Sequence, residues 1–138
     1  NNGLSSKIKV GENTKLPFPK NYFDLLISLN TIQYEKNEKD INKALNEYSR
    51  VLKKNGSLIL FTVGPKHFSY NHAKIVKPNI YSFKNWNGIK KQIFFHFDSL
   101  MHLKYFVGKK FSFLETGTTY ENLMGTDLDY LIIKAVKK

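Results

Sequence analysis

The sequence predicts an α/β fold with a mostly parallel sheet, and three segments support this prediction. Residues 23–29 (FDLLISL) and 57–63 (SLILFTV) are continuous apolar runs of strand length. Such runs are typical of parallel strands covered on both faces, since half-exposed antiparallel strands alternate apolar and polar residues. Between them, residues 40–52 carry apolar residues at helical spacing. Strand, helix and strand in this order predict a βαβ unit with a right-handed crossover.

The ends of these elements are predicted from capping and turn residues. Residues 7–11 (KIKVG) alternate polar and apolar and are expected to form a short strand. Asp40 is expected to cap the helix at its N-terminus. Asn55 and Gly56 are expected to end the helix in a left-handed conformation.

Residues 67–91 are predicted to be irregular. They are aromatic and polar, and Pro78, Gly88 and several asparagines interrupt any period. A long loop or small insertion is therefore expected, and such a loop inside a compact domain is usually functional.

Beyond this segment the sequence predicts a helix and a closing pair of strands. Asp98 or Ser99 is expected to cap a helix with one apolar face. Residues 111–117 and 129–136 are predicted strands joined by a loop that holds Gly125. Their closeness in the chain predicts an antiparallel pair at the edge of the sheet.

The charge of the chain is +11 at pH 7, with 22 Lys and Arg against 11 Asp and Glu, which would suit a polyanionic partner. However, 21 of the 22 basic residues are lysines and only Arg50 is an arginine. Readers of bases and phosphates favour the guanidinium fork instead. We therefore interpret the charge mainly as a solvated surface, with weak attraction to anionic substrates and with nucleic acid disfavoured as the partner.

Cysteine and metal-ligand patterns are absent from the sequence. Without cysteine there are no disulfides, thiolate metal sites or cysteine nucleophiles, and a cytoplasmic location is expected. No metal is expected either, because His67, His72, His96 and His102 lack the close spacing of ligand sets. No apolar run approaches the ~20 residues that cross a bilayer, so we expect no membrane span.

Four spaced elements in residues 16–61 resemble a known family. Leu-Pro-Phe at 16–18 precedes Phe-Asp at the start of the strand 23–29, Glu-x-x-Arg-Val-Leu at 47–52 ends the helix, and Gly56 precedes the next strand. In this order they are similar to the central signature of class I S-adenosylmethionine-dependent methyltransferases, especially those acting on ubiquinone and small molecules. The resemblance implies a Rossmann-like methyltransferase sheet, mostly parallel with an antiparallel C-terminal edge pair, and S-adenosylmethionine as cofactor.

The resemblance also implies strands that this sequence does not supply. In the family a Gly-rich loop after the first strand and an acid after the second precede the matched region, yet no Gly-x-Gly occurs in these 138 residues. The N-terminal strands are therefore expected to be absent. Residues 1–138 would form the C-terminal half of a domain that is inactive alone, with residues 67–97 as substrate lid or insertion.

This expectation accounts for the apolar character of residues 23–29. The strand would lie mid-sheet, between residues 57–63 and a first strand outside the sequence. Its uncovered edge predicts association, with the missing part or with a second copy of the chain.

By resemblance, five residues are candidates for binding the cofactor. Glu12 takes the place of an acid that accepts from the adenine amino group, and Asn13 presents the next backbone amide to a ring nitrogen. Leu29 and Asn30 match positions whose backbone lines the methionine part, and Tyr34 stands where many relatives carry histidine. Alternatively, Glu12 is an exposed loop acid and Tyr34 packs at the start of the next helix.

Few side chains are needed for catalysis, because methyl transfer is an in-line displacement in which the protein orients the reactants and excludes water. His67 and His72 are weak candidates for a base, since each follows the strand 57–63, and the Tyr34 hydroxyl is a third. Alternatively, both histidines are surface residues, which is the commoner role of such positions. Arg50 is expected to pair with Glu47 in a structural role.

Together these observations predict an enzyme that transfers a methyl group to a small-molecule, lipid or sugar acceptor. Two alternatives belong to other classes. A basic nucleic-acid-binding α/β module is suggested by the charge and by aromatics interleaved with lysine in residues 67–91. A non-catalytic interaction domain would follow if the cofactor site has been lost.

Overall fold

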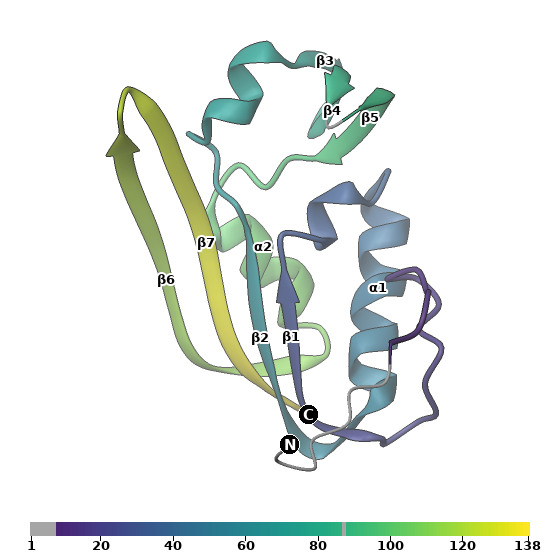
Figure 1. Ribbon diagram of the computed structural model, residues 1–138. Coiled ribbons are helices and arrows are strands. Elements are labelled where there is room, and N and C mark those ends of the chain that lie inside the picture. The colour runs from purple at the N-terminus through teal and green to yellow at the C-terminus, as the bar shows by residue number, and fades with distance from the viewer. Residues whose placement is uncertain (1–7, 87) are drawn as a thin grey trace, which may run out of the picture.

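The computed structural model describes residues 8–86 and 88–138, which form two β-sheets and two α-helices (Figure 1). The larger sheet has four strands and the smaller sheet three. In chain order the elements are β1 (Phe23–Leu29), η1 (Ile32–Tyr34), α1 (Glu38–Val51), β2 (Leu52–Val63), η2 (Phe68–His72), β3 (Lys74–Lys77), β4 (Ile80–Trp86), β5 (Ile89–Phe95), α2 (Leu100–Val107), β6 (Phe111–Leu123) and β7 (Thr126–Lys137).

The four-stranded sheet has the order β1-β2-β7-β6. β1 pairs with β2 in parallel, which confirms the predicted βαβ unit, and β7 pairs antiparallel with both β2 and β6. The predicted antiparallel C-terminal pair at the edge is therefore confirmed. The described sheet contains one parallel and two antiparallel pairs, so the expected mostly parallel character is not met within the residues described.

β1 forms one edge of this sheet. Its predicted neighbour β2 is present, and the described residues place no strand on its other side. Leu25, Ile27 and Leu29 are 47%, 55% and 57% exposed. These side chains are apolar, as in a strand buried inside a sheet. In the described residues, however, β1 lies at the edge of the sheet and these side chains are exposed.

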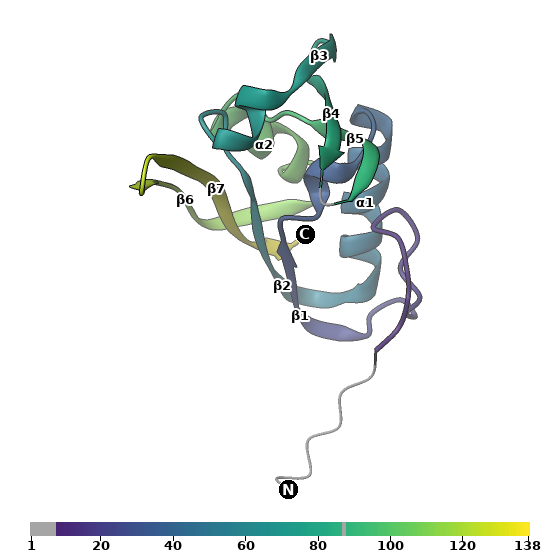
Figure 2. The same cartoon turned by 45° about the horizontal axis from the view of Figure 1, so that its top comes forward.

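Both α-helices lie on one side of the four-stranded sheet (Figures 1 and 2). Inward residues of β2 and β7 pack with the apolar faces of α1 and α2 into one core. On the opposite side, no helix of the described residues covers the sheet. A hollow of about 360 Å³ lies there, lined mainly by β2, β6 and β7 residues that include Ile59, Phe61 and Ile132.

The predicted strand at residues 7–11 is wrong where it can be compared. Lys7 lies outside the described residues, and residues 8–11 are not in a strand. Instead the chain turns at an isolated bridge between Glu12 and Lys15. The turn fits tightly, because a Cβ on Gly11 would lie 2.5 Å from the Pro17 ring.

The helix α1 begins and ends earlier than predicted. Its N-cap is Asn37, whose side chain accepts a hydrogen bond from the backbone of Asp40, so Asp40 lies in the first turn. The helix ends at Val51 and the chain enters β2 at once. Asn55 does adopt a left-handed conformation, with φ of 61°, but inside the strand.

Residues 67–91 are more regular than predicted, and the regular structure continues to Phe95. They contain η2 and an antiparallel sheet of β3, β4 and β5, rather than a long loop. The residues that interrupt any period make the turns: Asn79 and Gly88 have positive φ values of 60° and 78°. Proline, asparagine and glycine are common both in irregular loops and in tight turns, so their presence does not distinguish the two.

The C-terminal hairpin is also longer than predicted. β6 and β7 remain paired as far as Leu123 and Thr126, through most of the expected loop. Met124 and Gly125 turn the chain with φ values of 51° and 80°. Two successive positive φ angles are typical of a tight hairpin turn, which needs no longer loop.

Arg50 fastens the segment before β1 to α1. Its side chain donates to Glu47 Oε1 at 2.7 Å, to the carbonyl of Phe18 at 2.8 Å and to the carbonyl of Leu16 at 3.1 Å. Glu47 in turn accepts from the backbone amide of Leu16 at 2.8 Å. The hydrogen bond from Arg50 lowers the pKa of Glu47. The expected pair is thus present, and it also holds a loop.

We expect Arg50→Ala to lower the free energy of unfolding by about 1 kcal/mol, because two backbone carbonyls and Glu47 lose a charged donor. Urea denaturation measures this change. Lys43→Ala in the same helix is the control, since the exposed pair of Lys43 with Asp40 holds no loop, and its loss should stay within about 0.5 kcal/mol. Equal losses in the two variants would contradict the anchoring role.

Candidate functional site

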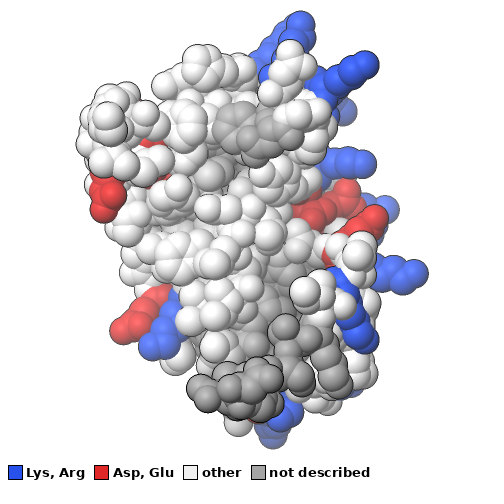
Figure 3. All heavy atoms as spheres, in the orientation of Figure 1, with Lys and Arg blue, Asp and Glu red and all other residues white. Residues whose placement is uncertain are grey.

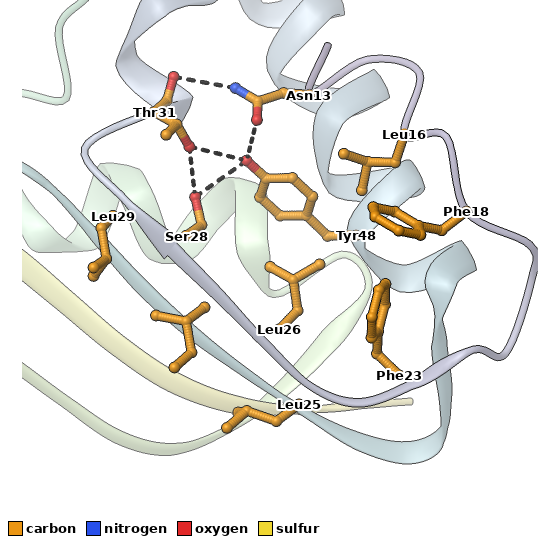
Figure 4. Close-up of a pocket in the computed structure, with 11 residues that line it drawn as sticks. Asn13, Leu16, Phe18, Phe23, Leu25, Leu26, Ser28, Leu29, Thr31 and Tyr48 are labelled. Carbon is orange, nitrogen blue, oxygen red and sulfur yellow. Dashed lines mark hydrogen bonds between the residues drawn. The ribbon is translucent and has the colours of Figure 1, made fainter. Parts of the chain in front are cut away.

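Two neighbouring hollows share Asn13 and Thr31: one runs along the whole of β1, and the other lies at its C-terminal end. The first, of about 350 Å³, is mostly apolar and follows β1 (Figure 4). The second, of about 550 Å³, is polar and is lined by the 11–14 turn, Thr31, residues 34–36 and Asp40. In open α/β sheets ligands bind beyond the C-terminal ends of parallel strands. These hollows are therefore the candidate site.

A buried hydroxyl network holds the 11–14 turn in place. The Tyr48 hydroxyl donates to Asn13 Oδ1 at 3.0 Å and lies 3.1 Å from Ser28 Oγ. Thr31 Oγ1 lies 2.8 Å from Ser28 Oγ. These side chains converge from α1, β1 and the loops on either side (Figure 4). Burial raises the pKa of Tyr48, so its hydroxyl keeps the proton that it donates.

Asn13 lies between the two hollows, and its side-chain nitrogen also forms hydrogen bonds. Its Nδ2 donates to the carbonyl of Thr31 at 3.2 Å and to Glu35 Oε1 at 3.1 Å. The chain reaches Thr31 through Asn30, whose positive φ of 49° turns it away from β1. Asparagine tolerates this left-handed conformation better than most residues.

The polar hollow is acidic. Glu12, Glu35 and Asp40 line it, with Lys36 as a basic neighbour. Burial raises the pKa of Glu35, and the charges of Asp40 and Glu12 add to this, while the hydrogen bond from Asn13 opposes it. The field in this hollow favours cationic ligand groups over anionic ones.

Four of the five predicted cofactor-binding residues line these hollows. Glu12, Asn13 and Tyr34 lie together at the polar hollow, and Leu29 lines the apolar one with Asn13. Asn30 is exposed and lines neither; its backbone amide donates to the carbonyl of Phe61 at 3.0 Å. The grouping agrees with a shared role, and the role itself remains a prediction.

The three predicted catalytic candidates do not share one hollow: Tyr34 lines the polar hollow, and the two histidines lie at η2. Tyr34 is 37% exposed, and its ring meets that of Phe94 edge-on at 4.7 Å. His67 is buried, accepts from the backbone amide of Ser69, and has its pKa lowered chiefly by burial. His72 is exposed at the end of η2. Neither histidine lines the two hollows.

Sequence reasoning missed Ser28, Thr31, Glu35 and Tyr48. Tyr48 packs in the core as part of the apolar face of the helix, but its hydroxyl reaches out to Asn13. Ser28, a polar residue near the C-terminal end of a strand rich in apolar residues, was the available signal. Among the described residues no group of three or more His, Asp or Glu side chains could hold a metal ion. No described helix is long and apolar enough to cross a bilayer.

The sequence and the fold are similar to those of known methyltransferases. Residues 1–60 match a family described as "Methyltransferase domain". The chain is 41% identical over 69 residues to malonyl-[acyl-carrier protein] O-methyltransferase 1 of Coxiella burnetii, a match that covers 50% of this chain and 23% of that relative. The matched chain thus spans about a quarter of the length of this relative.

Solved structures show the same fold. A SAM-dependent methyltransferase from Methanosarcina mazei has a TM-score of 0.75 at 19% identity, over 99% of this chain and 72% of its own. A 1,6-didemethyltoxoflavin-N1-methyltransferase from Burkholderia thailandensis, solved with its acceptor and S-adenosylhomocysteine, has a TM-score of 0.64 at 12% identity, over 91% of this chain and 48% of its own. The comparisons confirm the resemblance to class I S-adenosylmethionine-dependent methyltransferases.

We expect Glu35→Gln to stabilise the chain at neutral pH. Because the folded-state pKa of Glu35 is raised, the folded state binds this proton more tightly, and wild-type stability falls as pH rises above the ordinary value of 4.5. Glutamine removes the charge and still accepts from Asn13. Denaturation at several pH values should show an advantage that disappears below that value.

The matched control is Glu121→Gln, a change at an exposed glutamate of β6. Its effect should be small at every pH. A loss of stability in Glu35→Gln at neutral pH would contradict the electrostatic account of the polar hollow.

Proposed function

We propose that this chain forms the C-terminal part of an S-adenosylmethionine-dependent methyltransferase that acts on a small-molecule, lipid or sugar acceptor. The observation that carries the proposal is the convergence of Glu12, Asn13 and Tyr34 at one acidic hollow beside the C-terminal end of β1. The family match over residues 1–60 includes all three of these residues and the whole of β1.

The residues present fit the cofactor in part. The polar hollow has a volume of about 550 Å³, which is in the range of small-molecule sites. Glu12 and Glu35 offer acceptors to an amino group and complement positive charge, and the Asn13 amide is fixed by Tyr48 and Thr31. When bound, S-adenosylmethionine would supply an electrophilic methyl group. The chain's own contribution is to orient the cofactor and exclude water.

The other part of the site would come from polypeptide that pairs with the free edge of β1. The exposed Leu25, Ile27 and Leu29 and the uncovered face of the sheet support this proposal. We propose that residues 1–138 act as one partial domain, and that association with the completing polypeptide, or with a second copy, covers β1. The cytoplasmic location is proposed with it.

The acceptor would be held beneath the sheet of β3, β4 and β5. The contact between Phe94 of β5 and Tyr34 brings this sheet to the candidate site, which supports the proposed lid role of residues 67–97. The acceptor named for the Coxiella relative, malonyl-acyl-carrier protein, is the first to test. Small nitrogen and oxygen nucleophiles are the second group.

Calorimetric titration with S-adenosylmethionine tests the proposed function. We expect little heat from this chain and a dissociation constant on the order of micromolar from a chain extended at its N-terminus by a Gly-rich loop and a strand-ending acid. Labelled methyl transfer to the acceptors above follows in the extended chain. Tight binding by the 138-residue chain, or none by the extended one, would contradict the proposal.

In the extended chain, Glu12→Gln should weaken cofactor binding by about tenfold or more, because a charged acceptor is lost. Glu38→Gln, at an exposed position in the first turn of α1, is the matched control and should leave binding unchanged.

A further inference from the structure

Acidic residues are missing from a continuous part of the chain. Between Glu47 and Asp98 there is no Asp or Glu, whereas the same segment holds Arg50 and eight lysines. Six of these lysines fall in the part that contains the smaller sheet: Lys66, Lys74, Lys77, Lys84, Lys90 and Lys91. Basic side chains project over β3, β4 and β5 and also along the side of α1, while the view of the larger sheet is mostly uncharged (Figure 3). The segment that forms the smaller sheet therefore carries basic residues with no acidic residue to offset them.

Four lysines of the smaller sheet lie around one hollow, and two of them are directly opposite each other. Lys84 and Lys91 are directly opposite in the antiparallel pair of β4 and β5. Together with Lys74 and Lys90 they line a hollow of about 570 Å³. In the described residues, none of these four lysines forms an ion pair. Like charges directly opposite on a sheet are destabilising, so a bound anionic group would relieve a repulsion built into it.

Aliphatic side chains lie among these lysines. Ile75, Val76 and Ile89 are 63%, 50% and 49% exposed. Ile75 and Val76 line the same hollow as the lysines. A surface that combines lysine with exposed aliphatic residues is suited to a boundary that is anionic outside and apolar beneath.

We propose that the β3–β5 sheet is a peripheral docking surface for an anionic lipid bilayer. Its charge is carried by lysine, which protein–protein interfaces disfavour and base-reading proteins replace by arginine. Attraction to a charged bilayer needs no fork geometry, only several basic residues close to the surface. The exposed aliphatic residues would enter the interface between head groups and acyl chains. This inference is independent of the methyltransferase proposal, because docking requires neither cofactor nor acceptor.

Vesicle co-sedimentation of the full chain tests the docking surface. Binding to phosphatidylcholine vesicles should be weak, and added phosphatidylglycerol should strengthen it in a way that high salt reverses. The triple variant Lys74→Gln, Lys84→Gln, Lys91→Gln should lower the partition coefficient roughly a hundredfold, at about fivefold per lysine. The charge-matched control Lys39→Gln, Lys54→Gln, Lys110→Gln changes exposed lysines outside the smaller sheet, and it should lower binding only severalfold. Equal losses in the two triple variants would overturn the proposal.

A second pair of variants separates a bilayer from other polyanions. Ile75→Ser with Ile89→Ser keeps every charge and should weaken vesicle binding about tenfold or more. Its binding to heparin and single-stranded RNA should be unchanged. If RNA or an acidic protein binds wild type more tightly than the vesicles do and the isoleucine variant keeps full vesicle binding, the bilayer proposal is wrong. Circular dichroism and thermal unfolding check that each variant is folded.

Discussion

The parallel pairing of β1 with β2 is the constraint on which the rest of the structure depends. It fixes the crossover helix α1 on one face and directs Leu26 and Ser28 toward that helix. The same alternation leaves Leu25, Ile27 and Leu29 exposed. Apolar residues on both faces are typical of a strand that is covered on both faces. The described residues cover one face and one edge of β1. In this part of the chain the other edge has no partner strand and the other face is exposed, at the strand that forms part of the candidate site.

The helix α1 converts this pairing into a positioned site. One turn of its surface supplies Glu47, Tyr48 and Arg50, which hold the residues 11–18 against the end of β1. Side chains far apart in sequence thereby meet at a single acidic hollow. The basic smaller sheet lies on the other side of Tyr34, through its contact with Phe94. The two charged regions of the chain are thus distinct surfaces, which fits separate roles for cofactor binding and for docking.

Much of the central fold follows from local patterns, and the remainder depends on contacts that no local pattern encodes. The two strands and the helix between them were predictable because apolar runs of strand length and apolar residues at helical spacing are local patterns. The smaller sheet could not be predicted in the same way. Pro78, Asn79 and Gly88 are residue types found both in irregular loops and in the turns of hairpins. The resemblance predicted Glu12, Asn13, Leu29 and Tyr34 as cofactor-binding residues, and in the structure these four line the hollows. Tyr48 and Thr31 were missed because their roles depend on a hydroxyl network formed only in the folded chain.

Amide hydrogen exchange in β1 tests the central claim most directly, by comparing this chain with the N-terminally extended one. The account predicts that alternate amides of β1, those directed away from β2, exchange rapidly in the 138-residue chain and are protected in the extended chain. Amides that bond to β2 should be protected in both. Identical exchange of all β1 amides in the two chains would contradict the claim that this edge is completed by a further strand.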